Sequence, residues 1–208
     1  EVTAASLFAA PIRMILARGE PVKGLKLRHC WFAQNITQGQ YETVTKWFGC
    51  KPRQLYGMTE TIPAVLTDEK ENPDPSSMGF VTSGCLVDVQ RPDGTSVDPD
   101  EVGEIVVGGK RGVNIFNGYL DASAITQESF RDGWFLTGDL GYMDLQGFVF
   151  ITGRSSDMYI SGGSNIYPLE IEEKILKKLI PFTTEVNISM ILYACQYSDF
   201  STWRGDPV

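Results

Sequence analysis

A ring, a hydroxyl and a carboxylate follow one another at the end of a short apolar run. Residues 54–61 read QLYGMTET, so Tyr56, Thr59 and Glu60 stand within five positions. A strand that only fills a core needs no such ending. These side chains offer an aromatic face, a hydrogen-bonding hydroxyl and an anionic oxygen ligand. The stretch therefore suggests a place where a ligand is bound.

Two further clusters also put glycine beside a polar or charged residue after an apolar run. They are Thr-Gly-Asp at 137–139, and Gly-Arg-Ser-Ser-Asp at 153–157 followed by Gly-Gly-Ser-Asn-Ile-Tyr-Pro at 162–168. Singly, each has an ordinary interpretation: Tyr56 as a core aromatic, Thr59 as a helix cap, Asp139 as a turn residue and Arg154 as a surface ion pair. Together, in this order, they favour one shared site.

The elements that must position these clusters begin with an α/β region. We expect a helix or helix pair over 4–18, a buried strand over 25–33, a helix over 37–49 and a short strand over 53–57. Strand, helix and strand form a crossover unit, whose ligands gather at the carboxyl ends of the strands. Tyr56 stands at such an end.

A change of pattern follows the polar, turn-rich loop 68–79. From about 80 to 153 the sequence consists of short apolar runs bounded by Gly, Pro and Asp, with turn signals at 91–94 and 144–147. This predicts an antiparallel, sandwich- or barrel-like subdomain. Residues 167–179 then have the charge order and the apolar face of a helix.

Composition excludes several classes of function. The net charge of −8 disfavours non-specific nucleic-acid binding, and no apolar run is long enough to span a bilayer. The four cysteines lack the spacing of a metal or redox site, so we expect them to be reduced and the protein to be cytoplasmic. The one histidine, His29, is expected in a core or hydrogen-bonded role, and nothing near it suggests a Ser-His-Asp site.

The combination of motifs resembles the adenylate-forming enzymes, which include acyl-CoA synthetases, luciferases and peptide-synthetase adenylation domains. YGMTE, GWFLTGDLGYMDLQGFVFITGR and SSDMYISGGSNIYPLEIEE look like three core motifs of that family, and the resemblance covers about residues 1–176. It implies ATP-dependent activation of a carboxylic acid as acyl-AMP, followed by transfer to coenzyme A. Among subfamilies the sequence looks most like fatty-acyl and crotonobetaine/carnitine–CoA ligases, which implies a place in fatty acid metabolism.

The resemblance also implies residue roles, carried over by motif position. Tyr56 and Gly57 would contact the nucleotide, with the Tyr56 ring on adenine. Thr59 would bind the α-phosphate and Glu60 would hold Mg²⁺. Asp139 would accept the ribose hydroxyls, Arg154 would contact ribose or phosphate, Ser156 would be the hinge and Gly163 would line the pantetheine tunnel.

Some family features have no counterpart here. The family's phosphate loop and the late catalytic lysine are missing, WFAQN at 31–35 replaces a small Gly-rich segment, and the pattern stops after about Leu176. We therefore expect the isolated chain to be inactive. Two alternatives stay open: an adenylation domain that serves a carrier protein, and a non-catalytic relic or interaction module of the same fold.

The expected fold is α/β (α+β), the end of a large α/β adenylation domain with an antiparallel β-barrel-like subdomain and the start of a small C-terminal domain. The predicted divisions are 1–79 for the α/β part, 80–153 for the β-rich part, 154–180 for the hinge and the start of the C-terminal domain, and 181–208 for a divergent tail.

Overall fold

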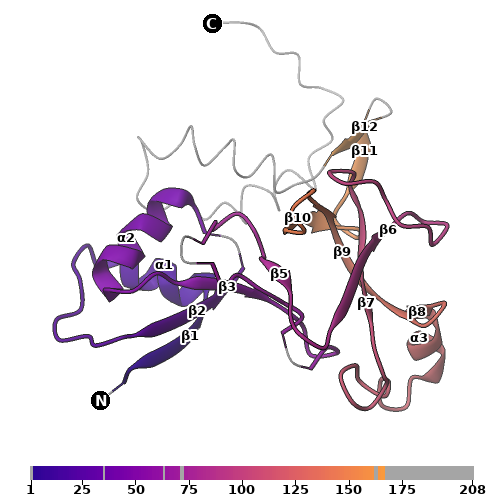
Figure 1. Ribbon diagram of the computed structural model, residues 1–208, viewed down its shortest axis with the longest axis horizontal. Coiled ribbons are helices and arrows are strands. Elements are labelled where there is room, and N and C mark those ends of the chain that lie inside the picture. The colour runs from indigo at the N-terminus through magenta and orange to yellow at the C-terminus, as the bar shows by residue number, and fades with distance from the viewer. Residues whose placement is uncertain (1, 35, 63, 71–72, 162–163, 167–208) are drawn as a thin grey trace, which may run out of the picture. The chain divides into compact units, whose positions relative to one another are not determined.

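The chain divides into two units, residues 1–158 and 159–208. A computed structural model describes residues 2–34, 36–62, 64–70, 73–161 and 164–166. Figure 1 labels most of the helices and strands of the described parts. All of the site geometry given below lies within the first unit.

The first sheet contains five strands in the order β1-β2-β3-β4-β5. These are β1 (Ala4–Phe8), β2 (His29–Ala33), β3 (Arg53–Tyr56), β4 (Leu66–Thr67) and β5 (Phe80–Val81). Strands β1 to β3 are parallel, whereas β4 and β5 each join in an antiparallel sense. Tyr56 is therefore the last residue of a parallel strand, as the sequence predicted.

Two helices, α1 (Ala9–Ala17) and α2 (Gln38–Phe48), pack on the face of β2 that carries Cys30 and Phe32. The helix predicted over 37–49 is confirmed by its two ends. The Thr37 hydroxyl accepts from the Gln40 backbone N–H, and the Gln40 side chain accepts from the Thr37 N–H, which forms a capping box. Gly49 ends the helix in the left-handed conformation, with φ of 71°.

The prediction of helix over residues 4–18 was wrong for its first part, because Ala4–Phe8 form strand β1. Every residue of β1 pairs with a residue of β2, from Ala4 with His29 to Phe8 with Ala33. This pairing outweighs the helix propensity of alanine and leucine. The helix begins only at Ala9, which places Pro11 in its first turn, where no backbone N–H is required.

The second sheet is antiparallel throughout, as predicted, with the strand order β10-β9-β7-β6 and with β8 paired to β9. Its elements are β6 (Leu86–Gln90), β7 (Gly103–Gly108), the short helix α3 (Ser123–Glu128), β8 (Phe130–Arg131), β9 (Trp134–Met143) and β10 (Val149–Arg154). Both predicted turns are present, since Gly94 N–H donates to Arg91 O and Gly147 N–H donates to Asp144 O, each at 2.9 Å.

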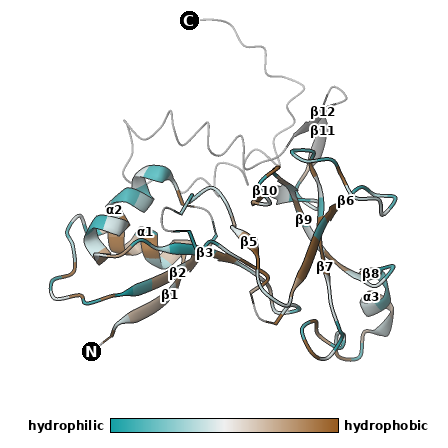
Figure 2. Cartoon of the chain, viewed as in Figure 1, coloured by the Kyte–Doolittle hydropathy of each residue, from teal (hydrophilic) through white to brown (hydrophobic). Residues whose placement is uncertain are grey.

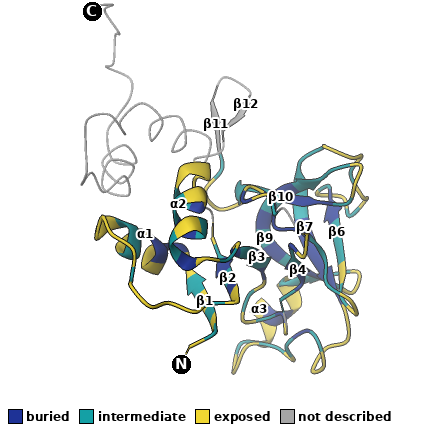
Figure 3. Ribbon diagram, turned by 60° about the vertical axis from the view of Figure 1, so that its left-hand side comes forward, coloured by how far each residue is buried: buried dark blue, intermediate teal, exposed yellow. Residues whose placement is uncertain are grey.

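A second core, distinct from that under α1 and α2, belongs mainly to this β-rich region. The apolar strand β7, brown in Figure 2, contributes Ile105 and Val107, and it meets Phe135 of β9 and Val149 of β10. Figure 3 shows the buried stretches of β7 and β9 in dark blue. Tyr56 belongs to this same core, so the end of the parallel strand packs into the antiparallel region.

The described part of the second unit is one antiparallel pair, β11 (Tyr159–Ser161) and β12 (Ser164–Ile166). The helix predicted over 167–179 and the predicted tunnel residue Gly163 lie outside the described residues. Within the part of the chain that the structure describes, no helix has the length and apolar character needed to cross a membrane.

Candidate functional site

A buried carboxylate, Asp139, meets the ring hydroxyl of Tyr56 at the junction of the two sheets. The Tyr56 hydroxyl donates to Asp139 Oδ2 at 2.7 Å, although the two residues are 83 positions apart. Tyr56 is 8% exposed and Asp139 is 9% exposed. Burial raises the pKa of the Tyr56 hydroxyl well above its ordinary value, and the Asp139 charge raises it further. The phenol therefore remains a proton donor to the carboxylate.

Arg154 supplies the second partner of Asp139. It is the last residue of β10 and stands directly opposite Asp139 in the antiparallel pairing of β10 with β9. Its Nε donates to Asp139 Oδ1 at 2.8 Å, and Nη2 donates to the Thr137 carbonyl at 3.5 Å. The Arg154 side chain is 56% exposed. Each oxygen of the carboxylate thus has one fixed donor, while the guanidinium also faces solvent.

The backbone around Asp139 is held by a network of its own. The Thr137 hydroxyl donates to Ile105 O at 2.6 Å and accepts from the Asp139 N–H at 3.0 Å. The N–H of Gly138, the residue between Thr137 and Asp139, donates to Glu104 Oε1 at 3.1 Å. Thr-Gly-Asp lies inside the ten-residue strand β9, so the interpretation of Asp139 as a turn residue is wrong. Thr137 and Glu104 were not predicted as supporting residues.

After Tyr56 the chain makes a turn that leaves Thr59 outside. The Thr61 hydroxyl closes this turn, because it accepts from Met58 N–H at 3.0 Å and donates to Met58 O at 3.2 Å. Thr59 is exposed, and its hydroxyl makes no hydrogen bond with any described residue. Residues 57–62 form no helix, so the interpretation of Thr59 as a helix cap is wrong. At Gly57, a Cβ would lie 3.0 Å from the Ala64 Cα.

The carboxylate of Glu60 has one described partner, the hydroxyl of Tyr119, which donates to Oε1 at 2.9 Å. Burial raises the pKa of the Tyr119 hydroxyl, and the hydrogen bond to Glu60 raises it further. Tyr119 was missed as a site residue because it lies in a loop, 59 positions from its partner. The described residues contain no group of three or more His, Cys, Asp or Glu side chains that could hold a metal.

Ser156, the predicted hinge, is exposed just after β10, and its hydroxyl donates to Asp157 Oδ1 at 2.8 Å. The division between the two units falls nearby, between Met158 and Tyr159. A hinge role for Ser156 stays a prediction. The structure thus joins Tyr56, Asp139 and Arg154 by direct hydrogen bonds. Glu60 is hydrogen-bonded to Tyr119 and not to these three residues.

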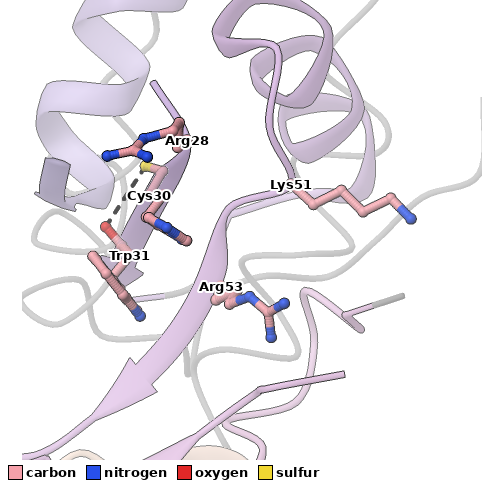
Figure 4. A pocket seen from close by; sticks show the side chains of 6 residues that line it. Arg28, Cys30, Trp31, Lys51 and Arg53 are labelled. Carbon is pink, nitrogen blue, oxygen red and sulfur yellow. Dashed lines mark hydrogen bonds between the residues drawn. The ribbon is translucent and has the colours of Figure 1, made fainter. Parts of the chain in front are cut away.

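An open pocket of about 380 Å³ lies at the amino ends of β2 and β3, away from the carboxyl end that carries Tyr56. It is drawn in Figure 4, and Arg28, Cys30, Trp31, Lys51 and Arg53 line it together with His29. The cation Arg53 donates to the Asp68 carbonyl at 3.4 Å. His29 is exposed and stacks on Trp31, so a core role for it was wrong.

Comparison with known proteins identifies a family for the chain. The family model described as AMP-binding enzyme matches residues 1–120. A 2-succinylbenzoate–CoA ligase of Bacillus licheniformis is 41% identical over 165 residues, which are 76% of this chain and 32% of that protein. One of Bacillus pumilus is 44% identical over 126 residues, which are 59% of this chain and 25% of that protein. The chain thus spans a quarter to a third of the length of these relatives.

Solved structures give the same result. O-succinylbenzoate coenzyme A synthetase from Bacillus subtilis, in complex with ATP and magnesium ion, is similar with a TM-score of 0.72 and 32% identity. The similarity covers 84% of this chain and 36% of that one. These relatives are ligases of 2-succinylbenzoate by name, so the predicted place in fatty acid metabolism has no support from them.

Proposed function

This chain belongs to the AMP-binding enzyme family, and on that premise we propose that it is part of an ATP-dependent acid–CoA ligase. The observation that carries the proposal is the buried carboxylate of Asp139 with a fixed donor on each oxygen. A carboxylate has about four lone-pair sites, so two partners leave room for two further hydroxyl donors. Adjacent hydroxyls of a ribose match that requirement.

The roles on the nucleoside side follow from exposure. Only 8% of the Tyr56 surface is exposed, which leaves a small area for a stacked adenine, whereas its hydroxyl is engaged by Asp139. We therefore assign Tyr56 two tasks: it lines the adenine position and it holds Asp139. The exposed guanidinium of Arg154 can reach a ribose or phosphate oxygen while its Nε keeps Asp139 in place.

The roles on the phosphate side fall to Thr59 and Glu60. The exposed Thr59 hydroxyl has no partner among the described residues and can donate to an α-phosphate oxygen. Glu60 would hold Mg²⁺ through one carboxylate oxygen. One carboxylate fits this ion, because Mg²⁺ is usually bound by one or two carboxylates together with substrate phosphates and water. When bound, the ion would neutralise charge on the phosphates.

The reaction has two steps. A carboxylate oxygen of the acid attacks the α-phosphorus, its new O–P bond forms as the bond to the bridging oxygen breaks, and pyrophosphate leaves. The sulfur of coenzyme A then attacks the acyl carbonyl, loses its proton to solvent and displaces AMP. Alignment matters more than a general base in the first step, since the nucleophile is already an anion. We propose 2-succinylbenzoate as the acid, because relatives 41–44% identical carry that name.

The test is a calorimetric titration of the 208-residue chain with a non-hydrolysable acyl-AMP analogue. Asp139→Asn keeps the side-chain volume but removes the charge, and it should weaken binding by about 10- to 100-fold, since hydrogen bonds to charged groups contribute about 1.5–3 kcal/mol. Asp132→Asn, at an exposed position between β8 and β9, is the control and should bind as the unaltered chain does.

Circular dichroism shows whether each variant is folded. Equal binding by Asp139→Asn and the unaltered chain would exclude the ribose role of Asp139. If the folded, unaltered chain binds no analogue, the proposal that its own residues build the nucleotide site is wrong.

A further inference from the structure

The segment that carries Glu60 is joined to a distant loop by its backbone. Thr61 forms an antiparallel bridge with Ile115. On one side of this bridge Phe116 N–H donates to Glu60 O at 2.8 Å, and on the other Ile62 N–H donates to Asn114 O at 3.1 Å. The path of the chain at Glu60 is therefore set by residues 114–116, which follow β7, rather than by β3 alone.

The same loop continues to Tyr119, and Tyr119 is itself held in place. Its backbone N–H donates to the Thr126 hydroxyl of α3 at 2.9 Å. Its ring meets Phe116 edge-on, with the ring centroids 4.8 Å apart. Phe116 in turn packs against Phe130 and Phe135. The hydroxyl that reaches Glu60 Oε1 therefore comes from an anchored ring.

We propose that Tyr119 is a positioning residue for the metal-binding carboxylate of Glu60. The inference rests on the proposed function, because the metal role of Glu60 is itself proposed there. The Tyr119 hydroxyl engages Oε1, and no described residue donates to Oε2, so the carboxylate keeps one oxygen for the ion. A glutamate side chain loses much rotamer freedom when it is fixed, and a partner that fixes it beforehand removes that cost from metal binding.

Packing alone would make a different prediction. If Tyr119 served only to fill space beside Phe116, its ring would be sufficient and its hydroxyl would be dispensable. Tyr119→Phe keeps the ring and removes only the oxygen. Residues that orient metal ligands typically change metal affinity by about 10- to 100-fold when they are altered. The metal dependence of nucleotide binding therefore separates the two roles.

The experiment measures the affinity of the 208-residue chain for α,β-methylene-ATP by calorimetry, once with Mg²⁺ and once with EDTA. The dissociation constant in EDTA, divided by the dissociation constant with Mg²⁺, gives a ratio that reports the metal contribution without any turnover. In Tyr119→Phe the ratio should fall about ten-fold, with the value in EDTA unchanged. Tyr142→Phe removes a hydroxyl from a ring that stacks on Phe150 of β10, and this control should leave both values unchanged.

Glu60→Gln, alone and combined with Tyr119→Phe, distinguishes the ways in which the proposal could fail. It should lower the ratio by itself, and adding Tyr119→Phe should then lower it no further. If Glu60→Gln lowers the ratio but Tyr119→Phe does not, the positioning role is wrong while the proposed function stands. If Glu60→Gln has no effect, the metal role of Glu60 is wrong and the role of Tyr119 falls with it. If the folded chain binds no nucleotide, both proposals are overturned.

Discussion

Asp139 and Glu60 are the two carboxylates of the candidate site, and two unlike regions of the molecule hold them. Asp139 lies inside strand β9 and is 9% exposed, with Tyr56 on one oxygen and Arg154 on the other. Glu60 lies in a turn and is partly exposed, and its side chain has one described partner, Tyr119. Regular sheet pairing thus positions the first, whereas contacts between two loops position the second.

The difference teaches that a binding site need not be equally rigid throughout. The ribose that we propose at Asp139 has a fixed shape, and a carboxylate fixed by two strands suits it. The metal ion that we propose at Glu60 would also take phosphates and waters as ligands, and one tyrosine contact leaves Glu60 an oxygen for the ion. If this distinction is correct, a substitution that disrupts the sheet should lower the free energy of unfolding strongly. Loss of the contact between Tyr119 and Glu60 should lower it only slightly.

The largest effect is expected at Gly79, which joins the sheet of β3 to the sheet of β10. Gly79 has φ of 89° and bridges Val149, while a Cβ there would lie 2.2 Å from the Thr67 carbonyl carbon. Gly79→Ala should lower the free energy of unfolding by about 3 kcal/mol, because overpacking and positive φ add. Gly84→Ala, with φ of 83° and open space, should lose only about 1 kcal/mol. Equal losses in urea denaturation would contradict the close approach at Gly79.

A smaller effect on the free energy of unfolding is expected when the tyrosine hydroxyl that contacts each carboxylate is removed. Tyr56→Phe removes a donor from buried Asp139 and should lower the free energy of unfolding by about 2 kcal/mol, the usual size for a hydrogen bond to a charged group. Tyr119→Phe removes a donor from the more exposed Glu60, and about 0.5 kcal/mol is expected. Urea denaturation of both variants gives the comparison. If Tyr119→Phe lowers the free energy of unfolding as much as Tyr56→Phe does, the loop contact holds Glu60 as firmly as the sheet holds Asp139.

Local signals in the sequence were enough for several elements. Helix α2 lies within the predicted range 37–49 and stops at Gly49 as predicted, and both turns of the β-rich region formed at their Gly and Asp positions. Strand β1 could not be predicted in this way. Ala4–Phe8 contain good helix formers, and only pairing with β2, a partner 25 positions along the chain, makes them a strand.

The site shows the same limit. Tyr56, Asp139 and Arg154 were found through motifs, and their convergence depends on β3 ending beside β9 and on the register of β10 with β9. Tyr119 carries no local signal that points to Glu60. Its role depends on the bridge between Thr61 and Ile115, a tertiary contact that neither segment encodes alone.

An effect as small as that at Tyr119 is expected at Arg154, the exposed partner of Asp139. Its ion pair joins Nε to Oδ1 at 2.8 Å, but the arginine side chain is 56% exposed, and such pairs contribute about 0–1 kcal/mol. Arg154→Gln should therefore lower the free energy of unfolding by about 0.5 kcal/mol at low salt, as measured in urea. At about 1 M NaCl the difference from the unaltered chain should shrink, because the screening length falls to about 3 Å.

Salt thus separates the two donors of one carboxylate. The loss in Tyr56→Phe should persist at high salt, since the Tyr56 hydroxyl is neutral and buried beside Asp139. If the Arg154→Gln loss were large and insensitive to salt, Arg154 would be part of the rigid interior, and both oxygens of Asp139 would be fixed from within the core. A small, screened loss means instead that Tyr56 fixes the carboxylate from the core while Arg154 holds it from the solvent side, where it can also meet a ligand.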